Sequence, residues 1–583
     1  MPRYARMLRG SPPPPRSANR PVPERDDASV RRIHDAFSQR NFRRDFSRRG
    51  LHYIGLLDET GLKVPAVVSV DDLDFIRPPV ICLTDPEAGS KGQVPHVLRS
   101  DGTFCYLDRK SVVLDRYKPA ETIIQCLERA DQVLRDAVRG RLVDDLAEEF
   151  GGYWSDGEVL VDLPPSFEGD AKVHILRLDR DPEHKTIVVS HDKTSFAKLH
   201  RRNTVKDPGP GILCPIILVP PLSFDPKLPW PPKDLAQLNG WLKKMAPNAL
   251  GSIEAAFART KDLHIQWICL SAPNGRVFVS AEIAKPYRTP EFLKNRRASI
   301  ARTLDRIPAA VEISGYVGVP ADEGYVFSRN LGHMKNLAGK RILLIGCGTV
   351  GGFLAQHLAQ SGAGAGGGRL MLVDDDELQG ANLGRHLLGA PYLTWNKAEA
   401  CADFLGQQLP HLDIGFSCDS IMKQLAIMQQ YDLCIDATGE EALSIALNDY
   451  AVRKRPDFPP ILYTWLEGNG AAAVGFMSHD PDLACFKCLK VELAGEKRFR
   501  LLREGVEIET ARNLACGDAH YIPFPVSRAA SAAGLACDMV LDWANNDDRH
   551  RWRSLTMDHR TANEVKDGNP KRVVKCPACG GSA

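Results

Sequence analysis

Three glycines are spaced so that the backbone between them could wrap around a phosphate group. Gly346, Gly348 and Gly351 follow an apolar run and lead into a helical pattern. Glycine lets the backbone turn tightly, and a helix N-terminus offers unpaired N–H groups to an anion. A second apolar run, residues 369–373, ends at Asp374, where a carboxylate can hold ribose hydroxyls. Taken alone, this pattern predicts a nucleotide site and favours a dinucleotide-dependent oxidoreductase.

Charged residues behind the glycine turn favour a different chemistry. Asn382, Arg385 and Lys397 follow the acids Asp374 and Asp376. An oxidoreductase has no general need for this amide and these two cations behind its ribose acid. A site that transfers a nucleotidyl group needs them, because cations must face a triphosphate and the charge that develops on its α-phosphorus. The residues that follow the glycine turn therefore predict a site for ATP.

Two further charged residues extend this pattern. Arg329 lies just before the first apolar run, in FSRNLGHM, and Asp436 ends another strand-like run, where a carboxylate can associate with Mg²⁺. Together with the glycine turn, these features resemble the adenylation domain shared by ThiF, MoeB and the ubiquitin-activating enzymes. The resemblance implies that Arg329, Arg385 and Lys397 stabilise phosphoryl charge, that Asp374 holds the ribose and that Asp436 holds magnesium. It also implies a homodimer, in which Arg329 reaches into the partner's site.

Four cysteines near the C-terminal end are spaced as metal ligands. They form two C-x-x-C pairs, Cys485 with Cys488 and Cys576 with Cys579. One such pair could be redox-active or accidental, but two pairs together complete a tetrahedral site and strongly favour structural Zn²⁺. The resemblance agrees, since many ThiF and MoeB proteins hold zinc with two such pairs. In the activating enzymes a thioester-forming cysteine lies in a mobile loop between the pairs, and Cys516 fits that position.

A second cysteine motif lies near the N-terminus. His96 stands nine residues before Cys105, and Gly102 stands three before it; the segment 117–120 reads Tyr-Lys-Pro-Ala. This pattern resembles a ubiquitin-conjugating domain and implies that Cys105 carries an acyl group. That family has His-Pro-Asn before its cysteine, whereas Val97 follows His96 here, so the asparagine that would steady an oxyanion is missing. His96 is expected to form a turn rather than to act as a base.

The elements that position these residues suggest an α/β protein of several domains. The apolar and helical patterns predict a disordered extension at 1–28, an α+β conjugating-like domain at 29–155 and an α+β connecting domain at 156–323. A doubly wound, Rossmann-like adenylation domain with the zinc site is expected at 324–583. The net charge of the full chain, +2, gives no argument for nucleic acid or a membrane, and no apolar run approaches ~20 residues. Fifteen cysteines without a disulfide-like framework fit a cytoplasmic chain.

The domain order resembles the fusion enzyme of antiphage CBASS operons. The resemblance implies that a protein C-terminus is adenylated, passed to Cys516 and then Cys105, and joined to an amine such as a lysine. In that family the activated protein is a cyclic-oligonucleotide synthase related to cGAS. Three alternatives stay open: another ubiquitin-like or sulfur-carrier pathway, a nicotinamide-dependent oxidoreductase, and a non-catalytic scaffold for a ubiquitin-like fold.

Overall fold

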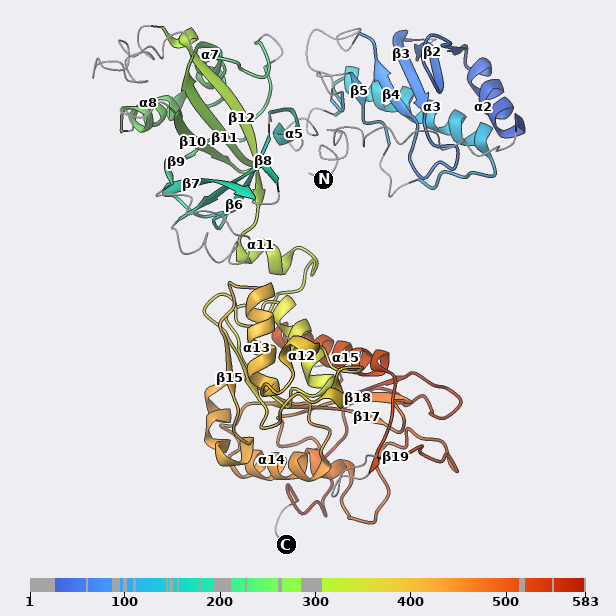
Figure 1. Cartoon of the computed structure of the whole chain (residues 1–583), viewed down its shortest axis with the longest axis vertical. Coiled ribbons are helices and arrows are strands. Elements are labelled where there is room, and N and C mark those ends of the chain that lie inside the picture. Colours follow the sequence, from blue (N-terminus) through green and yellow to red (C-terminus); the bar gives the residue numbers. More distant parts are fainter. Residues whose placement is uncertain are drawn as a thin grey trace. The chain divides into compact units, whose positions relative to one another are not determined.

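The computed structural model describes most of the chain in two compact units, the first ending at Pro320 and the second beginning at Ala321 (Figure 1). Each unit has its own apolar cores. No helix among the described residues is long and apolar enough to cross a membrane. The described residues are 27–58, 61–85, 95–97, 102–107, 112–142, 145, 150–154, 157–178, 181–191, 211–225, 228–259, 265–284, 307–512, 520–547 and 550–580.

The first unit begins with a helix, an antiparallel meander and a second helix. The strands are β1 (Arg43–Arg44), β2 (Leu51–Leu57), β3 (Val64–Val70), β4 (Val80–Leu83) and β5 (Thr103–Phe104), in that order across the sheet. Helices α2 (Asp27–Gln39) and α3 (Pro119–Val138) share one apolar core with the sheet. Proline suits the start of α3, because the first N–H groups of a helix have no intrahelical partner. This arrangement fits the α+β conjugating-like domain predicted for this part of the chain.

The rest of the first unit is a closed barrel. Its strand order is β10-β11-β12-β6-β8-β7-β9. The strands are β6 (Gly157–Asp162), β7 (Gly169–Leu178), β8 (Asp181–Ser190), β9 (Ile212–Leu218), β10 (Ile265–Ala272), β11 (Gly275–Ile283) and β12 (Val311–Pro320). Helices α7 (Leu235–Met245), α8 (Leu250–Arg259) and α5 (Phe150–Trp154) contribute to the core on one side of the barrel, where Phe150 and Trp154 stack near Trp241. The sequence analysis predicted an α+β connecting domain for this part of the chain, but it did not predict that the sheet closes.

The second unit is built on a mixed sheet of order β15-β14-β13-β16-β17-β18-β21, in which the first five strands run parallel. Its strands are β13 (Arg341–Ile345), β14 (Arg369–Val373), β15 (Ile414–Ser417), β16 (Leu433–Asp436), β17 (Ile461–Glu467), β18 (Ala472–Ser478) and β21 (Trp552–Thr556). A short helix, α11 (Glu323–Ser328), precedes the sheet, and a two-stranded ribbon, β19 (Ala511–Arg512) with β20 (His520–Tyr521), lies outside it.

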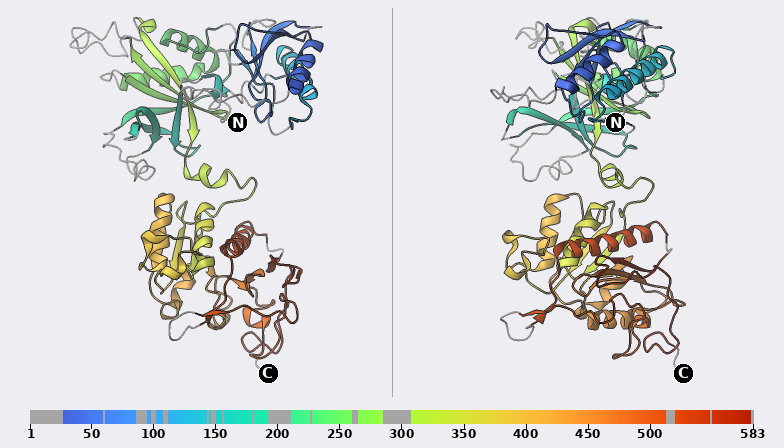
Figure 2. Two further views of the ribbon diagram at one scale, coloured as in Figure 1. Left: turned by 45° about the vertical axis from the view of Figure 1, so that its right-hand side comes forward. Right: turned by 90° about the vertical axis from the view of Figure 1, so that its right-hand side faces the viewer.

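Helices cover both faces of this sheet, as Figures 1 and 2 show. Helices α12 (Thr349–Gln360), α13 (Lys397–Gln408) and α15 (Val526–Ala544) pack in the core on one face. Helix α14 (Glu441–Arg453) packs on the other face, together with the cysteine pairs. The doubly wound fold predicted for this part of the chain is therefore confirmed.

Candidate active site

The glycine turn joins β13 to α12, and two of its three glycines are required by packing. Gly346 has φ +87°, and a Cβ there would lie 2.8 Å from Cγ2 of Thr438. A Cβ on Gly351 would lie 1.9 Å from the carbonyl oxygen of Gly346. Gly348 differs, because a Cβ there would meet nothing within 4 Å. The turn is thus closely packed behind and open in front of the α12 N-terminus, as an anion site requires.

Asp374 holds this turn against the end of β14. Its Oδ2 accepts a hydrogen bond from the N–H of Cys347 at 2.6 Å, and its Oδ1 accepts from the N–H of Asp376 at 2.9 Å. Burial raises the pKa of Asp374, and these two backbone donors act in the opposite direction. The predicted ribose acid therefore lies beside the glycine turn.

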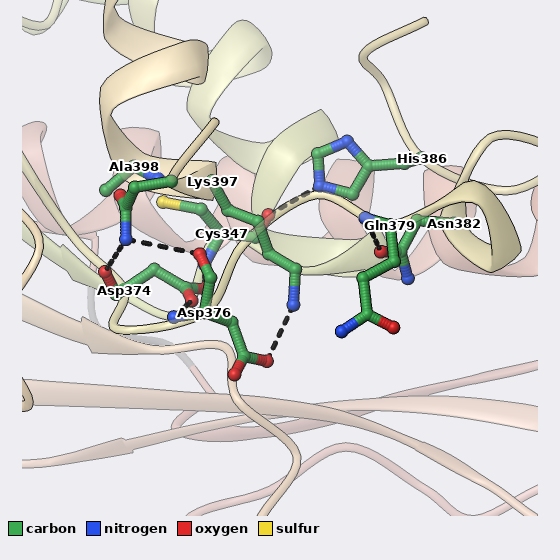
Figure 3. Close-up of polar contacts among 9 residues, drawn as sticks. Cys347, Asp374, Asp376, Gln379, Asn382, His386, Lys397 and Ala398 are labelled. Carbon is green, nitrogen blue, oxygen red and sulfur yellow. Dashed lines mark hydrogen bonds and ion pairs between the residues drawn. The ribbon is translucent and has the colours of Figure 1, made fainter. Parts of the chain in front are cut away.

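Lys397 and Asp376 face each other across this site (Figure 3). The Nζ of Lys397 lies 2.7 Å from Oδ2 of Asp376; the lysine side chain is only 11% exposed, and the aspartate side chain 73%. Lys397 is the first residue of α13, and Asn396 caps that helix by accepting from the N–H of Ala398. The Asn396 amide also donates to the carbonyl of Asp374 at 2.7 Å. Sequence analysis missed Asn396, although an asparagine before a helical pattern is an N-cap signal.

Asn382, Arg385 and His386 lie in the segment between β14 and α13. Asn382 accepts the N–H of Gln379 through its side chain at 2.8 Å, which closes the short helical turn Gly380–Asn382 (Figure 3). Arg385 has a buried Nε with no hydrogen-bond partner in the described part of the chain. This cation therefore has a buried donor available for a ligand.

His386 is a site residue that sequence analysis missed. Its Nε2 lies 2.7 Å from the carbonyl oxygen of Cys347 (Figure 3). Its Nδ1 accepts the N–H of Leu388 at 3.1 Å. These partners assign the hydrogen to Nε2 of a neutral ring. Burial first, and then the charges of Lys397 and Arg385, lower its pKa. No local motif marks His386, because its partner in the glycine turn is distant in the sequence.

Asp436, the predicted magnesium-associated acid, is buried at the end of β16. It is 1% exposed, and its Oδ1 accepts from both the N–H (3.1 Å) and the hydroxyl (2.6 Å) of Thr438. Its Oδ2 accepts from the hydroxyl of Ser444 at 2.5 Å. Burial raises its pKa. Both carboxylate oxygens thus fix the turn after β16, and a direct bond to a metal would require these contacts to change.

The four predicted metal ligands come together behind α14. The sulfur atoms of Cys485, Cys488, Cys576 and Cys579 all lie within 4.8 Å of one another. The backbone N–H of Val573 also points at the sulfur of Cys488, at 3.4 Å. A compact set of four sulfur donors fits the tetrahedral shell of Zn²⁺. The pairing of the two C-x-x-C segments across the sequence was correctly anticipated.

The structure describes only one of the two predicted acyl-carrying cysteines. Cys516 lies outside the described residues. Cys105 is partly exposed after β5, and its N–H donates to the carbonyl of His96 at 2.8 Å. Gly102, at φ +72°, packs against Leu83, where a Cβ would lie 2.2 Å from the carbonyl oxygen. These contacts fold the segment around Cys105 into a tight loop.

The remaining cation, Arg329, is exposed just after α11 and forms no ion pair within the described residues. His96 has φ +65°, as expected of a turn residue, and its Nε2 lies 3.1 Å from Asp145. Cys347 and Cys537 are both buried and are not candidate nucleophiles. Of the three predicted cations, only Arg385 and Lys397 therefore lie near the glycine turn in the described part of the chain.

Two family models match successive parts of the chain and agree with its fold. The ThiF family matches residues 326–571, and the prokaryotic E2 family B matches residues 30–160. These matches confirm the expected joining of a conjugating-like domain to a ThiF-type domain in one chain.

Full-length relatives identify the family more narrowly. The chain is 30% identical to the ATP-dependent ubiquitin transferase-like protein Cap2 of Pseudomonas aeruginosa (strain BWHPSA011 / Pa011), over 92% of this chain and 97% of that protein. It is 26% identical to Cap2 of Escherichia coli (strain TW11681), over 89% and 91%, and 26% identical to Cap2 of Vibrio cholerae serotype O1, over 85% and 88%. The chain belongs to the Cap2 family of ATP-dependent ubiquitin transferase-like proteins.

Proposed function

We propose that this enzyme adenylates the C-terminal carboxylate of a partner protein and transfers the resulting acyl group through two cysteines to an amine. The observation that carries this proposal is the open space at Gly348, in front of the α12 N-terminus and in the same site as Lys397 and Arg385. An oxidoreductase would leave those cations unexplained, and membership of the Cap2 family likewise favours the use of ATP.

In the first step a carboxylate oxygen attacks the α-phosphorus of ATP, and the bond to the bridging oxygen breaks to release pyrophosphate. Lys397 and Arg385 would stabilise the charge that develops on the phosphoryl oxygens, because preorganised cations act strongly in a site that excludes water. Asp374 would keep the glycine turn closed and hold the ribose. Asn382 would fix the backbone that carries Arg385.

Magnesium would neutralise charge on the triphosphate. Asp376 has an exposed carboxylate that could serve such an ion. Asp436 is buried, so we propose that it does not bind the ion directly but fixes the turn at Thr438 beside the ion site. Arg329 is exposed and thus available to the site of a second copy, as a homodimer would require.

Acyl transfer follows adenylation. The thiolate of Cys516 attacks the acyl carbon, AMP leaves, and a thioester forms. Cys105 then attacks that thioester and regenerates the first thiolate. Finally an amine of the target attacks the second thioester, the C–S bond breaks to release the Cys105 thiolate, and the amine loses a proton as the amide forms. The resemblance to CBASS enzymes leads us to propose a cGAS-like cyclic-oligonucleotide synthase as the activated protein, with the reaction in the cytoplasm.

Exchange of labelled pyrophosphate into ATP tests the proposed activation. We expect exchange with a cGAS-like synthase whose C-terminal carboxylate is free, and none when that carboxylate is amidated. A ubiquitin-like protein with a free C-terminus should be tested in parallel. Exchange with that protein alone would leave the chemistry intact but reassign the partner. Failure of every free carboxylate, with ATP bound, would contradict the proposal.

Zinc content is a separate expectation. We propose that the four clustered thiolates hold one Zn²⁺, and that this site stabilises the fold without taking part in acyl transfer. Replacing Cys488 and Cys576 together by serine should remove the metal and lower the melting temperature, because binding at such sites can contribute on the order of 10 kcal/mol. Atomic absorption of the purified chain measures the metal. Full zinc content in the double variant would show that these sulfurs are not its ligands.

A further inference from the structure

Helix α14 contacts both the end of β16 and the first C-x-x-C segment. The hydroxyl of Ser444 donates to Oδ2 of Asp436 at 2.5 Å. One helical turn later, Oδ1 of Asn448 accepts the N–H of Phe486 at 2.9 Å. Residues four apart lie on the same face of a helix, so these two contacts are made by one stripe of α14. The helix thus connects the end of β16 to the backbone between Cys485 and Cys488.

The contact at Asp436 reaches the glycine turn in one further step. Asp436 holds the N–H and hydroxyl of Thr438, and Thr438 lies so close to Gly346 that a Cβ on that glycine would come within 3.0 Å of the threonine's Cα and N. The N–H of Ala437 also donates to the carbonyl of Ile345 at 2.9 Å. Because a closely packed interior transmits displacements, a shift of this turn would move the backbone that faces the nucleotide.

The contact at Phe486 is equally specific. Asn448 is 1% exposed, and its Nδ2 has no hydrogen-bond partner among the described residues. The Phe486 ring lies 4.5 Å from the ring of Tyr463, which pairs with Asp436 across β16 and β17. An ion pair between Lys490 and Glu441 also joins α14 to the segment that follows Cys488. Because both side chains are partly exposed, this ion pair contributes little to stability. The amide oxygen of Asn448 is therefore the main polar link.

We propose that Asn448 is a positioning residue that couples the C-x-x-C turn at Cys485 to the nucleotide-binding glycine turn. Its amide oxygen fixes α14 relative to Phe486, and Ser444 on the same stripe then fixes Asp436, Thr438 and the wall behind Gly346. Asn448 needs no contact with the nucleotide for this role. The inference rests on the proposed function in one respect, namely that ATP binds at the glycine turn.

Substitutions at position 448 test the coupling in the full-length chain. Asn448→Leu keeps the volume but removes the acceptor, and Asn448→Asp keeps an acceptor oxygen. Asp449→Asn alters the neighbouring, partly exposed position of the same helix and serves as the matched control. We expect ATP to bind Asn448→Leu about tenfold more weakly, as the loss of one buried hydrogen bond can produce. Asp449→Asn should stay within about twofold of wild type, and Asn448→Asp, which keeps the acceptor but buries a carboxylate, should bind ATP more tightly than Asn448→Leu.

Titration of ATP by calorimetry gives the dissociation constants, and zinc content is measured on the same samples. Wild-type affinity in Asn448→Leu would overturn the coupling. Loss of zinc in that variant together with ATP binding would overturn it too, since Asn448 would then only maintain the cysteine cluster. If the wild type itself does not bind ATP, the proposed function is wrong. If the wild type and Asn448→Leu bind ATP equally well, only the coupling is wrong.

A second measurement needs no substitution. Coupling between two sites is reciprocal, so ATP should slow amide hydrogen exchange in the peptide around Phe486 as well as at residues 436–438. This result is expected even if Asn448→Leu does not fold. Protection by ATP that is confined to residues 436–438 would overturn the inference.

Discussion

Replacing Cys516 by alanine should abolish every thioester on the enzyme, whereas replacing Cys105 should leave the acyl group on Cys516. Adenylation needs neither thiol, so both variants should keep pyrophosphate exchange. A thiol with pKa ~8.5 attacks as its thiolate, and alanine cannot replace that nucleophile. Conjugation of the target should fall below detection in both. The measurement is a gel with and without reductant, after incubation with ATP and the partner protein.

Cys418 provides the matched control. It is an exposed thiol of the second unit, to which Cys516 belongs, and the proposed mechanism does not use it. Cys418→Ala should conjugate the target as the wild type does. Cys105→Lys should trap a stable amide on the enzyme if the acyl group reaches that position. Normal conjugation by Cys105→Ala would mean that the N-terminal domain is not a conjugating domain, and the chain would then be an activating enzyme with a docking module.

Replacing Lys397 by methionine should slow adenylation by about two orders of magnitude, which corresponds to about 3 kcal/mol for one aligned charge at a transition state. Methionine keeps the apolar stem, which matters because the Lys397 side chain is only 11% exposed. The variant should stay folded, and ATP–pyrophosphate exchange at saturating ATP measures the loss.

Lys423→Met is the control for Lys397→Met, since Lys423 also pairs with an aspartate but is 73% exposed. Its exchange rate should match that of the wild type. If Lys397→Met and Lys423→Met exchanged pyrophosphate equally fast, the ion pair of Lys397 with Asp376 would only connect β14 to α13. The catalytic cation would then be Arg385, whose Nε is buried without a partner in the described chain, or Arg329 from a second copy.

Local sequence patterns predicted the parts of the site that short segments build. The apolar run before Gly346, the glycine spacing and the acid at the end of the next strand each depend on neighbours in the sequence. Their geometry in β13, α12 and β14 follows the Rossmann pattern for that reason. The cysteine pairs could also be predicted from the sequence, because a spacing of two residues allows both thiolates of a pair to bind one metal.

Features that depend on distant partners were not predictable in this way. A strand ending in Asp436 does not reveal whether its carboxylate faces the site or Ser444 on the next helix; the structure shows the second arrangement. His386 has its partner in the glycine turn, and the closure of the barrel depends on pairing between β9 and β10 across helices α7 and α8. Such contacts are set by tertiary packing, which periodicity does not encode.

The cysteine cluster has a consequence for the order in which the enzyme becomes competent during its synthesis. Cys485 and Cys576 are separated by 91 positions, and β21 is also added to the sheet within that interval. A ribosome that adds about 5–20 residues per second needs several seconds to supply them. Until then the C-x-x-C turn that Asn448 contacts lacks half of its sulfur partners. A nascent chain would therefore complete its glycine turn early but would gain a fully supported ATP site only after Cys579 has emerged, so that incomplete chains would consume little ATP.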